Sequence, residues 1–220
     1  MSNYRRARIA GGTFFFTVVT YARLPRLASD SDVSLLRRTF EAVMARHPFT
    51  IDAMVILPDH LHCIWTLPEA DSDFSTRWRL VKAGFSRAYA GSTIEPVSLS
   101  RLKKSETDLW QRRFWEHSLR DEKDFETHCD YIHYNPVKHG LVRSPADWKH
   151  STFREFVARG VYPADWARDV VPQSATLALE SHDGGFRCAL PTLPADRRRF
   201  WGLQYTARMS RTITGLRDGD

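Results

Sequence analysis

The sequence predicts an α+β fold, a ferredoxin-like split βαβ sandwich in which an antiparallel sheet carries helices on one face. Segments with strand and helix patterns follow one another in the order β-α-β-β-α-β-α, which is the split βαβ arrangement with one further helix. Asp59 lies in a short Pro-Asp turn between the two central strand segments, which is typical of an antiparallel hairpin. The 220 residues, 42% of them hydrophobic, are enough to bury one sizeable core.

The first half of the chain supplies three strands and two helices. Residues 11–22 follow a glycine pair and are rich in β-branched and aromatic side chains, as in a buried strand. Residues 31–47 repeat apolar side chains at helical spacing behind an acidic first turn. Residues 49–58 and 61–68 are the predicted second and third strands. Residues 72–90 place apolar side chains at i, i+4, i+7 and i+11, which predicts a helix with one apolar face.

The second half begins with residues 91–108, which are polar and mixed and predict a loop. Residues 113–119 predict a fourth strand, and residues 120–135 a helix with Asp121 as its N-cap. Residues 171–220 mix Gly, Pro and Ser with an arginine run and show no sustained periodicity. We therefore predict one domain over residues 1–170 and a C-terminal extension over 171–220. The extension is predicted to be poorly ordered.

The charge balance predicts a polyanionic partner. The net charge is +6 and the pI is near 9.4, which favours nucleic acid first and an anionic membrane surface second; an ordinary basic surface is the alternative. Aromatic rings stand among arginines at two places, and flat rings beside guanidinium groups suit unpaired bases. The rings are Trp78, Trp110, Phe114 and Trp115, and the arginines are Arg77, Arg79, Arg112 and Arg113.

The composition also indicates the compartment. No run of about 18 apolar residues is present, so no segment is expected to span a membrane. The N-terminal residues are basic but lack a following apolar stretch, so no signal peptide is expected. The three cysteines, Cys63, Cys129 and Cys188, lie far apart and are odd in number. This pattern is typical of reduced, buried thiols in a cytoplasmic protein.

The stretch "LPDHLHCIW" places His60 and His62 two residues apart. If residues 61–68 form a strand, both imidazoles point to the same face, because side chains alternate with period two. Two imidazoles on one face can hold a divalent cation and leave coordination positions open for substrate oxygens. The alternative is that one or both rings only form hydrogen bonds at the start of the strand.

The stretch "DYIHYNPVKHG" places Tyr131 and Asn135 at i and i+4, so they are neighbours on one helix face. A tyrosine beside a metal on a basic scaffold can attack a phosphodiester. Alternatives stay open for each residue. Tyr131 is also explained as a half-buried ring with its hydroxyl in water, and Asn135 as the N-cap of a helix that starts at Pro136. Tyr134 is expected to point away from the core and is the weaker nucleophile candidate.

These motifs resemble those of the REP-associated tyrosine transposases, relatives of the single-strand transposases in the HUH nuclease class. The likeness runs from "YRRARIAGGTFFFT" through "LPDHLHCIWTLPE", "DFSTRW", "RFWEHSLRD" and "YIHYNPVKHGLV" to "DWKHSTFREFVARGVYPADWA", or about residues 4–167. The resemblance implies His60 and His62 as metal ligands, Asn135 as a third ligand, Mg²⁺ or Mn²⁺ as the metal, and Tyr131 as the nucleophile.

The resemblance further implies binding of REP-type hairpin DNA, with the segment from Arg5 to Thr13 recognising a short guide sequence. The glycines would allow close approach of a base or phosphate. Basic residues near the aromatic rings complete the predicted DNA contacts. The full set is Arg5, Arg6, Gly11, Gly12, Thr13, Arg79, Lys82, Arg112 and Arg113.

Two other functions compete with this one. A metal-dependent hydrolase with an HxH motif would use an activated water, but would need further ligands in a larger scaffold. A binding module would keep the DNA surface without catalysis. The sequence leaves the oligomeric state open between monomer and homodimer.

Overall fold

The computed structural model describes residues 8–89 and 109–168. The predicted loop 91–108, Arg5, Arg6, Cys188 and the predicted extension 171–220 lie outside these ranges. The chain divides into two compact units, Met1–Leu119 and Arg120–Asp220. The assignment of one domain to residues 1–170 stays a prediction.

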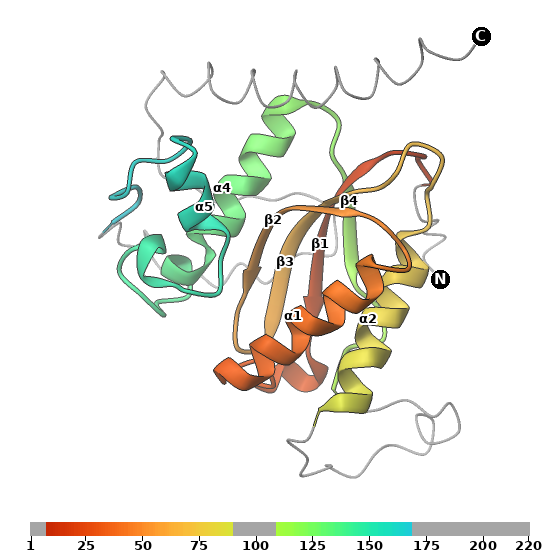
Figure 1. Cartoon of the computed structure of the whole chain (residues 1–220). Helices are drawn as coiled ribbons and strands as arrows, with labels where there is room; N and C mark the ends of the chain where they lie inside the picture. The colour runs from red at the N-terminus through yellow and green to blue at the C-terminus, as the bar shows by residue number, and fades with distance from the viewer. Residues whose placement is uncertain (1–7, 90–108, 169–220) are drawn as a thin grey trace, which may run out of the picture. The chain divides into compact units, whose positions relative to one another are not determined.

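A four-stranded antiparallel sheet forms the first unit (Figure 1). Its strands are β1 (Thr13–Val19), β2 (Thr50–Ile56), β3 (His60–Thr66) and β4 (Trp115–Ser118), in the order β2-β3-β1-β4. Strands β2 and β3 pair as an antiparallel hairpin across the Pro-Asp turn, as predicted. The order and directions are those of the split βαβ fold.

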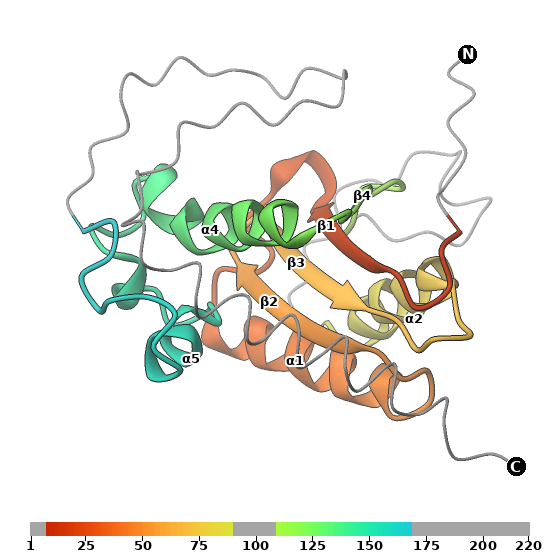
Figure 2. The same cartoon turned by 90° about the horizontal axis from the view of Figure 1, so that it is seen from above.

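Two helices lie on the same face of this sheet (Figures 1 and 2). Helix α1 spans Asp30–Met44 and helix α2 spans Phe74–Ala88. Each begins with a side-chain cap: Ser29 accepts a hydrogen bond from the backbone N–H of Asp32, and Asp73 accepts one from that of Thr76. Both caps satisfy backbone donors that the first helical turn leaves without a partner.

Strand alternation sorts the side chains of β1 and β3 onto two faces. Phe14, Phe16 and Val18 pair with Trp65, Cys63 and Leu61 on the face toward the helices, and all six belong to the hydrophobic core. Phe15, Thr17 and Val19 pair with Ile64, His62 and His60 on the opposite face. The histidine pair therefore lies on the sheet face opposite α1 and α2.

The predicted use of Trp78 and Trp110 for base stacking is wrong. Trp78 is 1% exposed, and its ring stacks on Trp65 at a centroid distance of 4.2 Å in the core. Trp110 is also buried, with its ring against Phe85. Of the rings named with the arginines, Trp115 is the exposed one.

Arg77, from the same stretch as Trp78, is a structural residue. Its guanidinium is buried and donates hydrogen bonds to the carboxylate of Asp71 and to the backbone carbonyls of His47, Pro48 and Asp73. The hydrogen bond from Arg77 also lowers the pKa of Asp71 below its usual value. A buried charge paired in this way connects the start of α2 to the segment after α1.

The second unit contains helix α4 (Glu122–Lys138), the short 3₁₀ helix η2 (Pro145–Asp147) and helix α5 (Phe153–Ala158). Asp121 caps α4 as predicted, since its carboxylate accepts the backbone N–H of Asp124. Aromatic rings join α4, α5 and the segment that follows α5. They are His133, Phe153, Phe156, Tyr162 and Trp166.

Helix α4 runs three residues further than predicted and includes Pro136. Proline removes one backbone donor and crowds the carbonyl four residues earlier, so a helix usually ends before it. Here the helix ends at Lys138, and Gly140 two residues later has a φ of +66°, which suits glycine. The backbone N–H groups of Gly140 and Leu141 donate to Val137 and Pro136, which closes the helix end.

Cys63 and Cys129 are buried free thiols, as predicted. Burial raises the pKa of the Cys63 thiol well above its usual value. Within residues 8–89 and 109–168, no helix is long and apolar enough to cross a membrane.

Candidate active site

The histidine pair lies at the start of β3. His60 and His62 occupy alternate positions opposite Val19 and Thr17 of β1, so both rings are on one face, as predicted. Their ring centroids are 4.9 Å apart, and the ring planes are nearly perpendicular. Both side chains are buried.

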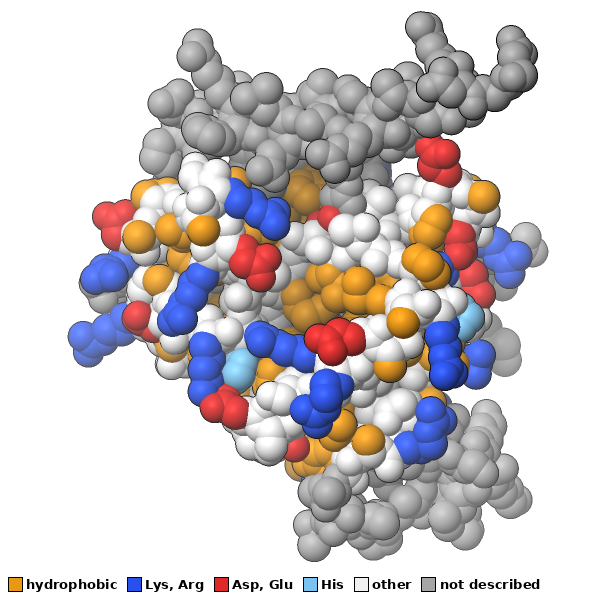
Figure 3. All heavy atoms as spheres, in the orientation of Figure 1, with side chains coloured by type: hydrophobic (Ala, Val, Ile, Leu, Met, Phe, Trp, Pro, Cys, Tyr) orange, Lys and Arg blue, Asp and Glu red, His pale blue; other side chains and the backbone are white. Residues whose placement is uncertain are grey.

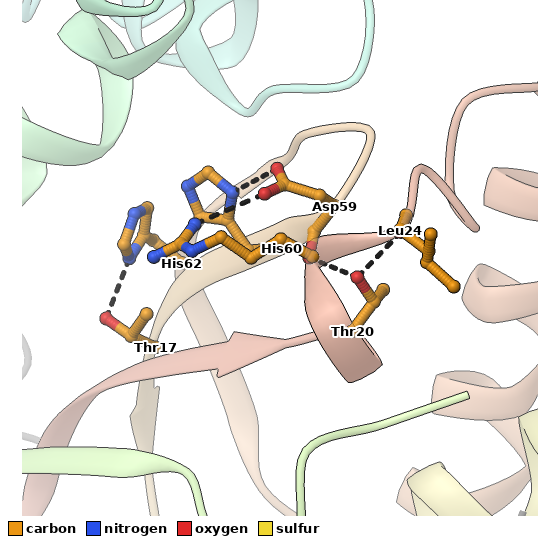
Figure 4. Close-up of polar contacts among 7 residues, drawn as sticks. Thr17, Thr20, Leu24, Asp59, His60 and His62 are labelled. Carbon is orange, nitrogen blue, oxygen red and sulfur yellow. Dashed lines mark hydrogen bonds and ion pairs between the residues drawn. The ribbon is translucent and has the colours of Figure 1, made fainter. Parts of the chain in front are cut away.

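Each ring is oriented through its Nδ1 atom (Figure 4). His62 Nδ1 lies 2.9 Å from the hydroxyl of Thr17, and His60 Nδ1 lies 2.6 Å from a carboxylate oxygen of Asp59. Metal-binding histidines commonly hold a carboxylate, carbonyl or hydroxyl at one nitrogen and bind the ion through the other. This arrangement is the one expected if both rings present Nε2 to a cation.

Asp59 is a site residue that the sequence pattern did not indicate. Its carboxylate contacts His60 through one oxygen and lies 3.2 Å from the Arg23 guanidinium through the other. Burial alone would raise the pKa of Asp59, but the hydrogen bonds and charges of His60 and Arg23 lower it to about 2. Asp59 is therefore a carboxylate at neutral pH, and it joins Arg23 to the histidine pair.

A strained turn holds Arg23 in place. The 3₁₀ turn η1 (Tyr21–Arg23) places Ala22 and Arg23 at φ values of 51° and 54°, which residues with a Cβ rarely adopt. Thr20 secures this turn, because its hydroxyl lies 2.7 Å from the carbonyl oxygens of both Leu24 and Asp59 (Figure 4). Strain of this kind persists where the surrounding contacts fix the backbone, and it often accompanies function.

The nucleophile candidate Tyr131 is on α4 in the second unit. Its side chain is buried, and the ammonium of Lys138 lies 4.9 Å from the centroid of its ring. Tyr131, Asn135 and Lys138 are spaced i, i+4 and i+7, so they share one helix face. Lys138 was not among the predicted site residues, although the same spacing indicates it. Tyr134 is 3% exposed, so the prediction that it points away from the core is wrong.

Asn135 has a buried side-chain amide that lacks hydrogen bonds within the described residues. Its side chain is fully buried, and neither amide atom has a hydrogen-bond partner among the residues that the structure describes. The N-cap alternative is wrong, because α4 continues through this residue to Lys138. A buried amide without partners is unfavourable by about 1–3 kcal/mol, so its presence favours a bound ligand.

We expect Asn135→Leu to raise the free energy of unfolding by about 1 kcal/mol while lowering activity. The apolar side chain has a similar size and removes the unsatisfied amide. His133→Leu on the same helix is the control, because it removes a hydrogen bond between Nε2 and the Thr152 hydroxyl and should destabilise the protein. Urea unfolding of the parent protein and the two variants measures both changes in stability. Destabilisation by Asn135→Leu would contradict this account of the residue.

The backbone and its packing explain why glycine occupies positions 11 and 12. Gly11 has a φ of +67°, and a Cβ there would lie 3.1 Å from the Cα of Glu69. A Cβ on Gly12 would lie 2.8 Å from the ring of Phe14. Thr13 contacts the Thr66 hydroxyl at 2.8 Å. Thr13 lies six positions along β1 from Val19, the partner of His60, or roughly 20 Å away. The contact of these three residues with DNA stays a prediction.

The other predicted DNA contacts lie on α2 and before β4. Arg79, Arg112 and Arg113 are exposed. The ammonium of Lys82 donates to the backbone carbonyls of Gln111 and Arg112, and so connects α2 to the segment before β4. Figure 3 shows the face that carries α1 and α2, with Lys and Arg side chains over both helices.

A groove of about 590 Å³, which the sequence did not indicate, lies between α1 and α2. Arg38, Arg46 and Arg87 line it together with His47, and no carboxylate is among its lining residues. Gly84 lets the helices approach closely there, since a Cβ would lie 2.8 Å from the methyl group of Thr39. The groove adds a basic surface on the face opposite the histidine pair.

The chain is similar to proteins of one family. It is 49% identical over 175 residues to a REP-associated tyrosine transposase of Escherichia coli K12, covering 80% of this chain and 96% of that protein. It is 41% identical over 166 residues to a Haemophilus influenzae protein that carries the same family name, covering 76% and 93%. A solved structure of such a transposase bound to a REP hairpin matches with 47% identity and a TM-score of 0.64, covering 80% and 96%. No family model matches the chain.

Proposed function

This chain belongs to the REP-associated tyrosine transposases, enzymes with a catalytic tyrosine, and we propose that it is a single-strand DNA endonuclease and strand transferase acting on REP-type hairpins. The buried histidine pair, with both rings oriented through Nδ1, is the observation that carries this proposal. The net charge of +6 and the exposed arginines before β4 support a polyanionic substrate.

In the proposed reaction Tyr131 is the nucleophile. Its phenolic oxygen attacks the scissile phosphorus and loses its proton, the bond from phosphorus to the 3′ oxygen breaks, and a 5′-phosphotyrosine and a 3′-hydroxyl result. Attack by a 3′-hydroxyl on this linkage reverses the step and joins strands without a nucleotide cofactor. An ordinary phenol has a pKa near 10, so the phenolic proton must be lost close to positive charge. Lys138, beside the Tyr131 ring, supplies such a charge.

We propose that His60, His62 and Asn135 hold Mg²⁺ or Mn²⁺. The donors fit such an ion: two imidazoles held through Nδ1 lie on one sheet face, and Asn135 has a buried amide oxygen without a protein partner in the described part of the chain. When bound, the ion would neutralise charge on the scissile phosphate. Thr17 and Asp59 hold the two rings in the orientation that this requires.

A denaturing gel tests the proposal. The protein is incubated with single-stranded DNA carrying a REP-type hairpin and its flanking bases, with Mn²⁺, and covalent protein–DNA bands are sought. A band whose linked peptide contains Tyr131 supports the proposal. Cleavage without a covalent band would favour a hydrolase with an activated water, and tight binding without cleavage would favour a binding module.

We expect Asp59→Ala to weaken Mn²⁺ binding by about 10- to 100-fold, because the variant releases the ring of His60. Titration with Mn²⁺, followed by electron paramagnetic resonance, measures the affinity without any DNA. Asp52→Ala is the matched control, since its carboxylate accepts a hydrogen bond from the Thr66 hydroxyl at the other end of the hairpin. Equal Mn²⁺ affinities for Asp59→Ala and the parent protein would show that Asp59 does not contribute to the metal site.

A further inference from the structure

Trp115 is an exposed aromatic ring at the edge of the sheet. Its side chain is 36% exposed, while Trp65, Trp78, Trp110 and Trp166 are at most 5% exposed. It begins β4, the edge strand next to β1. A large exposed ring on a sheet edge offers a flat surface to a ligand.

Trp115 and His62 share one cross-strand row. Both are register partners of Thr17, Trp115 from β4 and His62 from β3. Paired residues on neighbouring strands point to the same face, so Trp115 lies on the face that carries the histidine pair. Two strand spacings separate the backbones of Trp115 and His62, or roughly 10 Å. A nucleotide adjoining a phosphate held at the histidines could therefore place its base on this ring.

Two neighbouring rings contact Trp115. Its ring stacks on His117 at a centroid distance of 5.9 Å and an interplanar angle of 10°, and meets Phe15 edge-on at 5.7 Å. Phe15 in turn stacks on His62 at 5.5 Å. The row of rings runs without a break from the histidine pair to the sheet edge, and it holds the exposed ring in one orientation.

The segment before Trp115 brings positive charge to the same edge. Arg112 and Arg113 are exposed and precede the ring by three and two residues. The backbone of this segment is fixed, because Gln111 donates to the carbonyl of Val19, and Lys82 donates to the carbonyls of Gln111 and Arg112. Guanidinium groups beside a flat ring form the combination that binds unpaired nucleotides.

We propose that Trp115 is a stacking platform for an unpaired base of the DNA strand that flanks the scissile phosphate. The proposal rests on the proposed function. Every base has a π face, so the platform contributes affinity and position and little sequence discrimination. It should act on DNA with a single-stranded flank and not on a hairpin without one.

A double-mutant cycle tests the platform. All binding is measured in the Tyr131→Phe background, so that no strand is cleaved. Trp115→Ala should weaken binding of a flanked hairpin by about 5- to 150-fold, as for one base–aromatic stack, and Trp115→Phe should restore most of the affinity. Abasic sites are placed one at a time along the flank. At one position the abasic DNA should bind Trp115→Ala no more weakly than intact DNA does, because the stack is already lost.

Two further measurements sharpen the result. 2-Aminopurine at that same position should be quenched by the protein that carries Trp115 and not by Trp115→Ala. Trp148→Ala, which removes a partly exposed tryptophan of the second unit, should leave both readouts unchanged.

Abasic effects that add to Trp115→Ala at every flank position would overturn the platform, and so would an equal loss of affinity for a hairpin without a flank. A change in self-association in place of DNA affinity, measured by sedimentation, would also overturn it. A missing covalent band in the parent protein would instead refute the proposed reaction and leave the binding cycle interpretable.

Discussion

Tyr131→Phe should abolish the covalent protein–DNA band and lower cleavage by roughly 10³-fold or more, while hairpin affinity stays within about twofold of the parent value. The variant loses one oxygen and keeps the ring that Lys138 contacts. Band intensity on a denaturing gel and affinity by fluorescence anisotropy measure the two effects on the same DNA.

Tyr134→Phe is the matched control for this variant. Tyr134 is also on α4 and is also buried, so its loss of a hydroxyl reproduces any general effect on the helix. Full cleavage by Tyr131→Phe, together with loss of cleavage by Tyr134→Phe, would show that Tyr134 is the nucleophile.

His62→Ala should lower Mn²⁺-dependent cleavage by about 10²- to 10³-fold, an effect comparable to the loss of one group that stabilises charge in a transition state. Excess chelator should do the same to the parent protein. Single-turnover rates across a Mn²⁺ titration measure the effect, and thermal unfolding shows how much comes from the cavity that the buried ring leaves.

Thr17→Val separates the orientation of His62 from its presence. This variant keeps the imidazole but removes the hydroxyl 2.9 Å from Nδ1. Cleavage should therefore fall less than in His62→Ala, and it should fall because the metal binds more weakly. His150→Ala provides the control for removal of a histidine elsewhere. Undiminished cleavage in excess chelator would refute the metal site.

Much of the fold could be predicted because its signals are local. The period-two pattern of β1 and β3 fixes which side chains share a face of the sheet. His60 and His62 are two positions apart on β3, so they lie on the same face. The turn at Asp59 and the cap at Asp121 also depend on residues close in the chain. Each of these features follows from neighbours within a few positions.

Composition alone could not separate surface from core in residues 77–79. Successive residues on a helix point about 100° apart, so Arg77 and Trp78 are buried while the adjacent Arg79 is exposed. An arginine next to a tryptophan therefore says little about nucleic acid until the helix face is known. The N-cap alternative for Asn135 was wrong for a related reason, since α4 continues through Pro136, a residue that local preference would place at a helix start.

The contact between Arg23 and Asp59 was beyond sequence reasoning for a different reason. It joins residues 36 positions apart, and it depends on a turn whose two strained positions hold alanine and arginine in place of the usual glycine or asparagine. Nothing in the local pattern marks such a turn. Long-range side-chain contacts of this kind require the three-dimensional structure.

The strained turn η1 has a consequence for engineering a more thermostable enzyme. A left-handed backbone conformation is unfavourable by roughly 1–2 kcal/mol for a residue with a Cβ, and Ala22 and Arg23 both adopt it. Glycine at position 22 would relieve strain without removing any functional group, whereas glycine at position 23 would delete the guanidinium beside Asp59. Two adjacent residues with the same backbone geometry thus differ in evolvability. Ala22 is open to a stabilising substitution, whereas the contact with Asp59 constrains Arg23.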